Sequence, residues 1–157
     1  MRPGSGGIEL RLHLARTVDR DVWRSAREAI PEHRAVVVKA RARGESGWGE
    51  APEFMASVYS SHIATLLRRL REVEPVLRSC DPDRPELTWS ALFPVLADSP
   101  FALGAIDVAG HDLAARLSGV PLYERLGLPD PEGRPSTYSI GLDEPGAMVA
   151  KLRGFAG

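Results

Sequence analysis

Three stretches in the first third of the chain show the alternation of apolar and polar side chains that is typical of half-buried β-strands. Apolar and charged residues alternate over residues 8–18, residues 34–43 contain a run of β-branched valines, and residues 48–51 end at Pro52. The intervening residues 19–32 are mostly polar and indicate an exposed loop. Three neighbouring strands of this kind predict a three-stranded antiparallel meander.

After the third strand, the apolar residues take up the spacing of α-helices. In the first predicted helix the apolar positions are Val58, Ile63, Leu66, Leu67, Leu70 and Val73. A second helix is predicted over residues 87–97, and a third from Pro100 to about Ser118. Ser99 is a candidate N-cap of the third helix, and Gly119 is its C-terminal stop. The pattern predicts an α+β fold in which the meander is followed by a three-helix bundle.

The last part of the chain changes character at a linker rich in proline. Residues 137–142 alternate again and predict a strand, and Asp143 can cap a helix that begins near Pro145 and runs toward Phe155. This strand and helix form a lone βα unit without a pairing partner of its own. The expected parts are a first domain (1–128), a linker (129–136) and the start of a second domain (137–157).

Length and composition exclude several classes of protein. With 157 residues, 43% hydrophobic and 26% charged, the chain has the composition of a globular domain. No apolar run approaches the roughly 18 residues of a membrane helix, and residues 1–7 lack the apolar segment of a secretory signal. A net charge of −1 makes nucleic acid a poor partner. The single Cys80 fits a reducing compartment, so we expect a cytoplasmic protein.

A glycine-rich stretch places Gly47 and Gly49 on either side of Trp48, directly before Glu50. A phosphate-binding loop needs a third glycine and the start of a helix, and the Glu50 carboxylate would repel a phosphate. The stretch therefore indicates turn and strand packing, with phosphate binding as the weaker alternative.

The acidic and histidine clusters lack the spacing of a metal or catalytic site. Asp81, Asp83 and Glu86 are interleaved with prolines and indicate a surface turn rather than a calcium loop. Asp107 and His111, one helical turn apart, could take part in acid–base chemistry. Without a nearby nucleophile in an elbow, a structural role at a domain junction is favoured. The residue types and their spacing alone therefore predict no set of catalytic residues.

Three segments, met in order along the chain, carry a resemblance to a known family. The first is GESGWGEAPE, residues 44–53, and the second is ALGAIDVAGHDLAARLSGVPLYERLG, residues 102–127. They resemble the glycine-rich turn and the long helix of the N-terminal domain of the enolase superfamily, of the mandelate racemase/muconate lactonizing enzyme type. The third is STYSIGLDEPGAMVAKL, residues 136–152, which resembles the first barrel strand and helix of the dipeptide epimerase branch.

The resemblance implies a capping domain over a modified (β/α) barrel. In that family a lysine removes the proton α to a carboxylate, and Mg²⁺ stabilises the enediolate. Dipeptide epimerases invert their C-terminal residue in this way. The family's lysine bases and Mg²⁺ ligands lie on later barrel strands, and Lys151, in the first barrel helix, does not match them. We therefore expect neither a catalytic residue nor a metal ligand here, but a truncated, N-terminal piece that is inactive alone.

A capping domain can still carry substrate specificity, and three positions match the family's specificity positions. Trp23 stands at the aromatic residue of the loop over the active site, and Ser139 stands at the strand-one threonine. Some relatives that bind acidic side chains have an arginine where this chain has Glu28, so a carboxylate there favours a basic or neutral substrate. Packing by Trp23 and a solvated charge at Glu28 are the open alternatives.

The resemblance also implies the partners. A small, dipeptide-like substrate is expected only with a complete barrel, Mg²⁺ only in the full-length enzyme, and no nucleic acid or membrane. A homo-oligomer is left open. The alternative function, from a different class, is a stand-alone binding or assembly module that kept the cap and lost the barrel.

Overall fold

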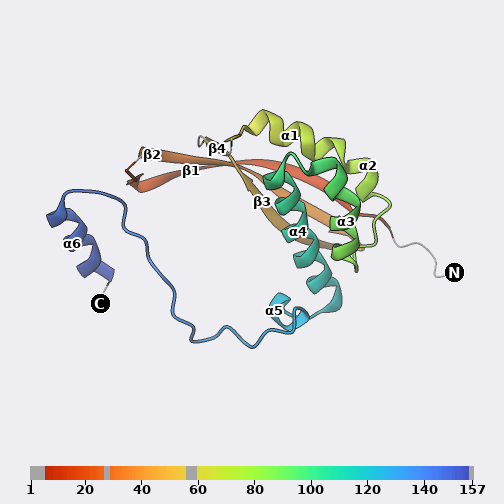
Figure 1. Cartoon of the computed structure of the whole chain (residues 1–157). Helices are drawn as coiled ribbons and strands as arrows, with labels where there is room; N and C mark the ends of the chain where they lie inside the picture. The colour runs from red at the N-terminus through yellow and green to blue at the C-terminus, as the bar shows by residue number, and fades with distance from the viewer. Residues whose placement is uncertain (1–5, 27–28, 56–59, 156–157) are drawn as a thin grey trace. The chain divides into compact units, whose positions relative to one another are not determined.

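A computed structural model describes residues 6–26, 29–55 and 60–155 (Figure 1). The elements, in chain order, are β1 (Glu9–Arg24), β2 (Ala29–Ala42), β3 (Glu45–Pro52), β4 (Phe54–Met55), β5 (Ser60–Ser61), α1 (Ile63–Glu72), α2 (Glu74–Leu77), α3 (Pro85–Leu96), α4 (Pro100–Ser118), α5 (Leu122–Arg125) and α6 (Pro145–Phe155). They fall into two compact units. The first comprises the chain up to Ala15 and Arg34–Asp130, and the second comprises Arg16–His33 and the chain from Pro131 onward.

The sheet of the first unit has the strand order β1-β2-β3, as predicted. Strands β2 and β3 pair antiparallel, from Ala35 opposite Pro52 to Ala42 opposite Glu45. The prediction of an exposed loop over residues 19–32 is wrong, because β1 continues to Arg24 and β2 begins at Ala29. The two strands of this hairpin are held together by backbone hydrogen bonds, so they can form where apolar and polar side chains do not alternate along the sequence.

Helix α4 packs directly on β3 through two glycines. A Cβ atom added to Gly47 would lie 2.1 Å from the carbonyl oxygen of Ala109, and one added to Gly49 would lie 2.0 Å from that of Ala105. Between them, the backbone N–H of Trp48 donates a hydrogen bond of 2.9 Å to the Asp112 carboxylate. The glycine-rich stretch therefore brings a strand to backbone distance from a helix, which confirms the packing role expected for it.

The predicted ends of α4 are confirmed. The helix begins at Pro100 after Ser99, although the Ser99 side chain makes no capping hydrogen bond, and it ends at Ser118 before Gly119, whose φ of +70° is left-handed. Helix α1 begins later than the sequence indicated, at Ile63, because the short β4–β5 pair precedes it. The Glu53 carboxylate accepts a hydrogen bond of 3.1 Å from the Ile63 N–H. A residue ten positions upstream therefore stabilises the start of this helix. Val58 lies outside the described residues.

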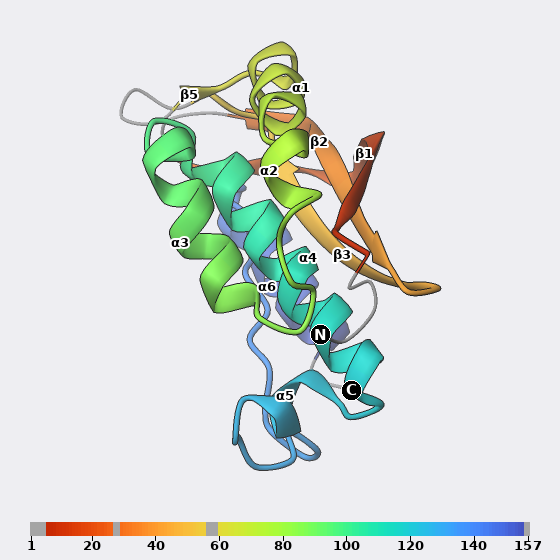
Figure 2. The ribbon, with the colours of Figure 1, turned by 90° about the vertical axis from the view of Figure 1, so that its right-hand side faces the viewer.

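The first unit is layered, with α4 between the sheet and α3 (Figure 2). The core between these layers is mostly apolar, and it also buries the Thr88 hydroxyl. Its largest fully buried side chains include Val36, Val38, Leu66, Leu70, Leu77, Leu92, Leu96, Ile106 and Leu113. Three antiparallel strands followed by helices confirm the predicted α+β fold class.

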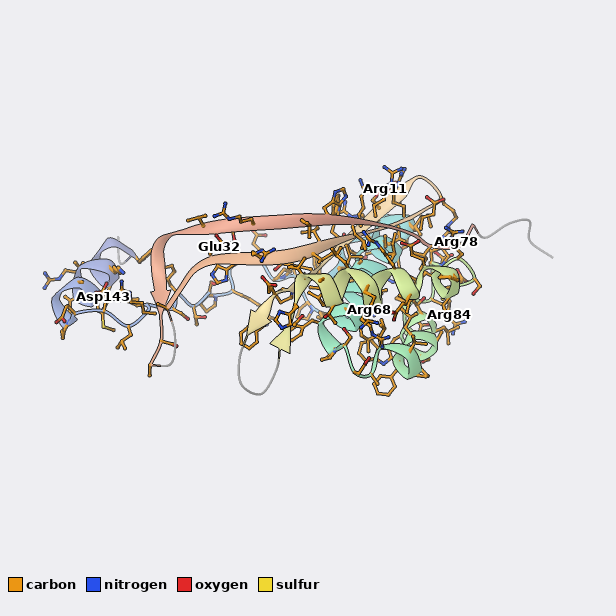
Figure 3. The ribbon with its side chains drawn as sticks, turned by 90° about the horizontal axis from the view of Figure 1, so that it is seen from above. Arg11, Glu32, Arg68, Arg78, Arg84 and Asp143 are labelled. Carbon is orange, nitrogen blue, oxygen red and sulfur yellow. The ribbon has the colours of Figure 1, made fainter. Side chains whose placement is uncertain are left out.

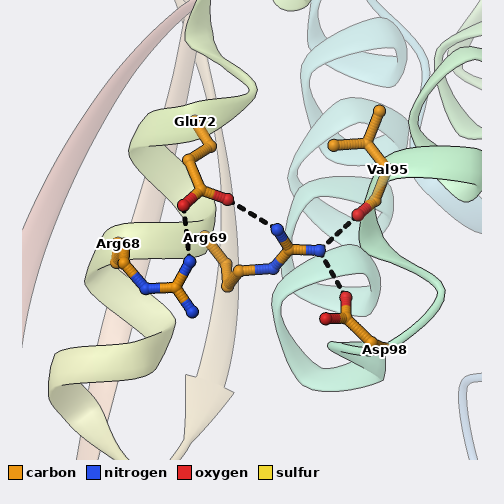
Figure 4. Close-up of polar contacts among 5 residues, drawn as sticks. All are labelled: Arg68, Arg69, Glu72, Val95 and Asp98. Carbon is orange, nitrogen blue, oxygen red and sulfur yellow. Dashed lines mark hydrogen bonds and ion pairs between the residues drawn. The ribbon is translucent and has the colours of Figure 1, made fainter.

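An arginine joins α1 to the end of α3 (Figure 4). The Arg69 guanidinium donates hydrogen bonds to Glu72 at 2.6 Å, to the carbonyl oxygen of Val95, and to Asp98. Arg68 donates a second hydrogen bond of 2.6 Å to Glu72. The hydrogen bonds from Arg69 and Arg68 hold the pKa of the Glu72 carboxyl below its ordinary value.

This network makes part of the stability depend on pH. Because the pKa of Glu72 is lower in the folded chain, its contribution is present above the unfolded pKa of about 4.3 and is lost as pH falls through the folded pKa. We expect Glu72→Gln to lower the urea midpoint of unfolding at neutral pH, and the difference from wild type to vanish in acid. The control, Glu50→Gln, is expected to leave the midpoint unchanged. An equal loss at every pH would contradict this account.

In the second unit, α6 is confirmed between Pro145 and Phe155, but the predicted strand over residues 137–142 is not present. A strand needs a neighbour along its length, and here one backbone hydrogen bond, from the Leu142 N–H to the Arg24 carbonyl oxygen at 2.8 Å, ties the segment to the hairpin. The Tyr138 and Phe155 rings stack with centroids 3.8 Å apart. The division into domains at residues 128 and 136 stays a prediction.

Candidate functional site

An open hollow lies in the second unit, where the β1–β2 turn meets the segment before α6. Its described lining is Arg24, Ser25, Ala26, Ala29, Leu142, Asp143 and Glu144. The hydrogen bond from Leu142 to the Arg24 carbonyl holds the two walls together. The site is therefore made by two segments more than a hundred residues apart in the sequence.

The polar wall of the hollow is organised by Asp143, which precedes α6 (Figure 3). Its carboxylate accepts the Glu144 N–H at 2.9 Å and an Nζ–H of Lys151 at 3.2 Å. These two hydrogen bonds, with the charges of Lys151 and Arg24, lower the pKa of the Asp143 carboxyl. Asp143 is thus ionised at neutral pH and already paired.

Two other charges line the hollow without such pairing. Among the described residues, neither the Arg24 guanidinium nor the Glu144 carboxylate has a side-chain hydrogen bond or ion pair. Because the charge of Arg24 already acts on the Asp143 carboxylate, Glu144 is the charge of the described lining that is left for a ligand. A ligand that carries a cationic group would find a partner there.

The structure describes only some of the predicted specificity residues. Trp23 lies in β1 rather than in a loop, and its side chain is outside the described part of the structure. Glu28 lies outside the described residues. Ser139 is exposed in an irregular segment and does not line the hollow. Sequence reasoning missed Arg24 and Glu144, and it saw Asp143 only as a helix cap.

The other candidates have structural surroundings. Asp81 accepts the Asp83 N–H at 3.0 Å, as in the predicted surface turn. His111 Nε2 and Asp107 Oδ1 are 3.8 Å apart along α4. Over residues 6–26, 29–55 and 60–155, no three His, Cys, Asp or Glu side chains are placed to hold a metal ion. These residues do not fit a Mg²⁺ site, so we derive no step through that metal.

In the same described ranges, no helix has the length and apolar character needed to cross a membrane.

Comparison with known proteins identifies the family. Residues 12–127 match the family described as mandelate racemase/muconate lactonizing enzyme, N-terminal domain. The chain belongs to the mandelate racemase/muconate lactonizing enzyme family. This match confirms the resemblance to the N-terminal region of the enolase superfamily.

Two relatives and one solved structure are similar to this chain over most of its length. An L-Ala-D/L-amino acid epimerase of Flavobacterium johnsoniae is 28% identical over 82% of this chain and 38% of its own length. An L-Ala-D/L-Glu epimerase of Bacteroides thetaiotaomicron is 30% identical over 78% of this chain and 31% of its own length. The dipeptide epimerase of Cytophaga hutchinsonii, complexed with Mg and D-Ala-L-Val, has the same fold, with a TM-score of 0.84 at 20% identity over 96% of this chain and 41% of that one. The chain thus spans well under half the length of these family members.

Proposed function

We propose that this family member is the capping part of a Mg²⁺-dependent dipeptide epimerase, which inverts an amino-acid centre by abstracting the proton α to a carboxylate. The observation that carries the proposal is the alignment of most of the chain with epimerases of dipeptides in two organisms. The bases and Mg²⁺ ligands would come from a barrel, and the chain alone would be inactive. The same proposal places the protein in the cytoplasm, in keeping with its single cysteine.

The hollow beside the β1–β2 turn is the part of this chain that would contact substrate. A free dipeptide carries one ammonium and one carboxylate group. In the proposed chemistry the carboxylate lies at the Mg²⁺ of the barrel, so the ammonium group is the one that remains for this hollow, and the Glu144 carboxylate suits it. Glu28, Trp23 and Ser139 stay proposed specificity residues, with Glu28 favouring basic or neutral over acidic dipeptides.

The proposal is tested by joining the chain to the barrel of the Flavobacterium johnsoniae relative and measuring kcat/KM for dipeptides. Glu144→Gln is expected to lower kcat/KM for free dipeptides about tenfold, because a lost charge-assisted hydrogen bond costs about 1.5 kcal/mol. N-acetyl dipeptides, which lack the ammonium group, should be unaffected by this variant.

The controls separate binding from structure. Arg11→Ala removes an exposed arginine on the side of the sheet opposite Arg68 (Figure 3), and it is expected to leave kcat/KM unchanged. The chain without a barrel should give only the background rate of α-proton exchange. If Glu144→Gln slowed N-acetyl and free dipeptides alike, the hollow would not be the ammonium site. An inactive fusion whose parent barrel works with its own cap would contradict the capping role.

A further inference from the structure

A small cavity lies between helices α3 and α4 of the first unit, which run side by side (Figure 2). Its volume is about 10 Å³. A space of about 10 to 15 Å³ is the smallest that holds one water molecule, and such a space holds water only where its wall offers polar partners. Most of the wall is apolar, but α3 contributes Thr88 and α4 contributes Asp107.

Thr88 is the polar group on the α3 side of the cavity. The residue is only 3% exposed, and its hydroxyl is buried without a hydrogen-bond partner among the residues that the structure describes. A hydroxyl in a helix can bond the carbonyl oxygen four residues earlier, as Ser90 of the same helix does with Glu86 at 3.0 Å. The Thr88 hydroxyl makes no such bond. Because a buried hydroxyl without a partner is costly, such a group in a native protein is normally bonded to ordered water.

Asp107 supplies a second polar group from α4. Its carboxylate lies 3.8 Å from His111 Nε2, which is too far for a hydrogen bond. Within the described part of the chain, this carboxylate accepts no hydrogen bond from another side chain. The cavity wall therefore carries a free donor on one helix and a free acceptor on the other.

We propose that one ordered water molecule binds in this cavity and bridges the two helices. It accepts a hydrogen bond from the Thr88 hydroxyl and donates one to the Asp107 carboxylate. Two such bonds are within the range of about two to four that buried water molecules make in proteins. Helix α4 also packs on β3, so the water would hold α3 to the helix that carries the sheet.

Gly110 of α4 keeps this space open. A Cβ atom added to Gly110 would have the Pro85 Cβ as its nearest neighbour outside its own helix, at 3.5 Å, which is an ordinary van der Waals contact. Because Gly110 also lines the cavity, the methyl group of Gly110→Ala would occupy volume that the water needs. This variant can therefore displace the water without changing either of its hydrogen-bond partners.

Oxygen-17 magnetic relaxation dispersion of the folded chain tests the proposal, because it counts the water molecules that stay bound for longer than the protein tumbles. We expect the wild type to hold one more such water molecule than Thr88→Val and Gly110→Ala. The matched controls are Thr65→Val, at an exposed threonine of α1, and Gly104→Ala, whose methyl group would meet nothing within 4 Å. Both controls should keep the wild-type count. An equal count in the wild type and the two cavity variants overturns the proposal.

Urea unfolding gives a second test, in which the sign of one substitution is compared in two backgrounds. With the water in place the Thr88 hydroxyl is bonded, so Thr88→Val should lower the urea midpoint of the wild type. In Gly110→Ala the hydroxyl has lost its water, so the same substitution should raise the midpoint, because valine keeps the shape and removes an unpaired polar group. In the Gly104→Ala background the midpoint should fall as in the wild type.

Two results of the urea experiment contradict the water bridge. A higher midpoint for Thr88→Val in both the wild type and Gly110→Ala would show that the hydroxyl is unbonded even when the cavity is open. A lower midpoint in both would show that the hydroxyl bonds a group of the protein, since displacing the water then changes nothing.

Discussion

Gly49→Ala is expected to unfold most of the first unit. The added methyl group would lie 2.0 Å from the Ala105 carbonyl oxygen, and both partners are backbone in regular elements. Neither can move aside as a flexible side chain would, so β3 and α4 must separate and their shared core must open. We expect a cost of about 3 kcal/mol or more, a large part of the 5 to 15 kcal/mol that is typical of a whole domain.

Thermal and urea unfolding followed by circular dichroism measures this cost, and a second glycine supplies the control. A Cβ atom on Gly104 in α4 would meet nothing within 4 Å. Gly104→Ala should therefore raise stability by up to about 1 kcal/mol, because alanine favours the helix interior. If Gly49→Ala unfolded at the same temperature and urea concentration as the wild type, the strand and helix would not be in backbone contact.

Leu113→Ala is expected to have the next largest effect. Leu113 is fully buried, and its backbone lies against Gly47, so the surroundings cannot easily collapse into the space left by the side chain. Truncations of this kind cost about 2 to 5 kcal/mol, through lost burial and the cavity left behind.

If the dependence of the unfolding free energy on urea concentration is the same in both proteins, the shift of the urea midpoint between wild type and variant gives the difference in free energy of unfolding. Leu14→Ala removes the same atoms from a side chain that is 65% exposed, and it should change the free energy of unfolding by no more than about 0.5 kcal/mol. Similar losses for the two leucines would place Leu113 outside the core.

The sequence predicted best those elements whose ends are set by neighbouring residues. Helix α4 begins after Ser99 and ends at Gly119, both signals within the helix's own sequence. The hairpin arm of β1 and β2 escaped prediction because its strands pair through backbone groups and show no hydrophobic period. The strand predicted at residues 137–142 is not present, since alternation of apolar and polar residues alone does not provide a strand to pair with.

The candidate site was harder to foresee than the fold. Arg24 and Glu144 are ordinary charged residues in their local sequence, and they meet only because the Leu142 N–H binds the Arg24 carbonyl. Trp23 was found through resemblance rather than through its own surroundings. Local patterns therefore found the elements, whereas the charges of the hollow depend on contacts between distant segments.

The backbone contact between β3 and α4 also limits which insertions and deletions this fold can accept. Successive side chains of a strand point to opposite faces, so a shift by a single residue would turn Trp48 toward the helix, into the space that now admits only hydrogen atoms. A shift by two residues would keep the alternation. Among descendants of this sequence, selection should remove insertions or deletions of a single residue in the turn at Arg43 and Gly44. Substitutions on the outer face of the sheet should accumulate freely.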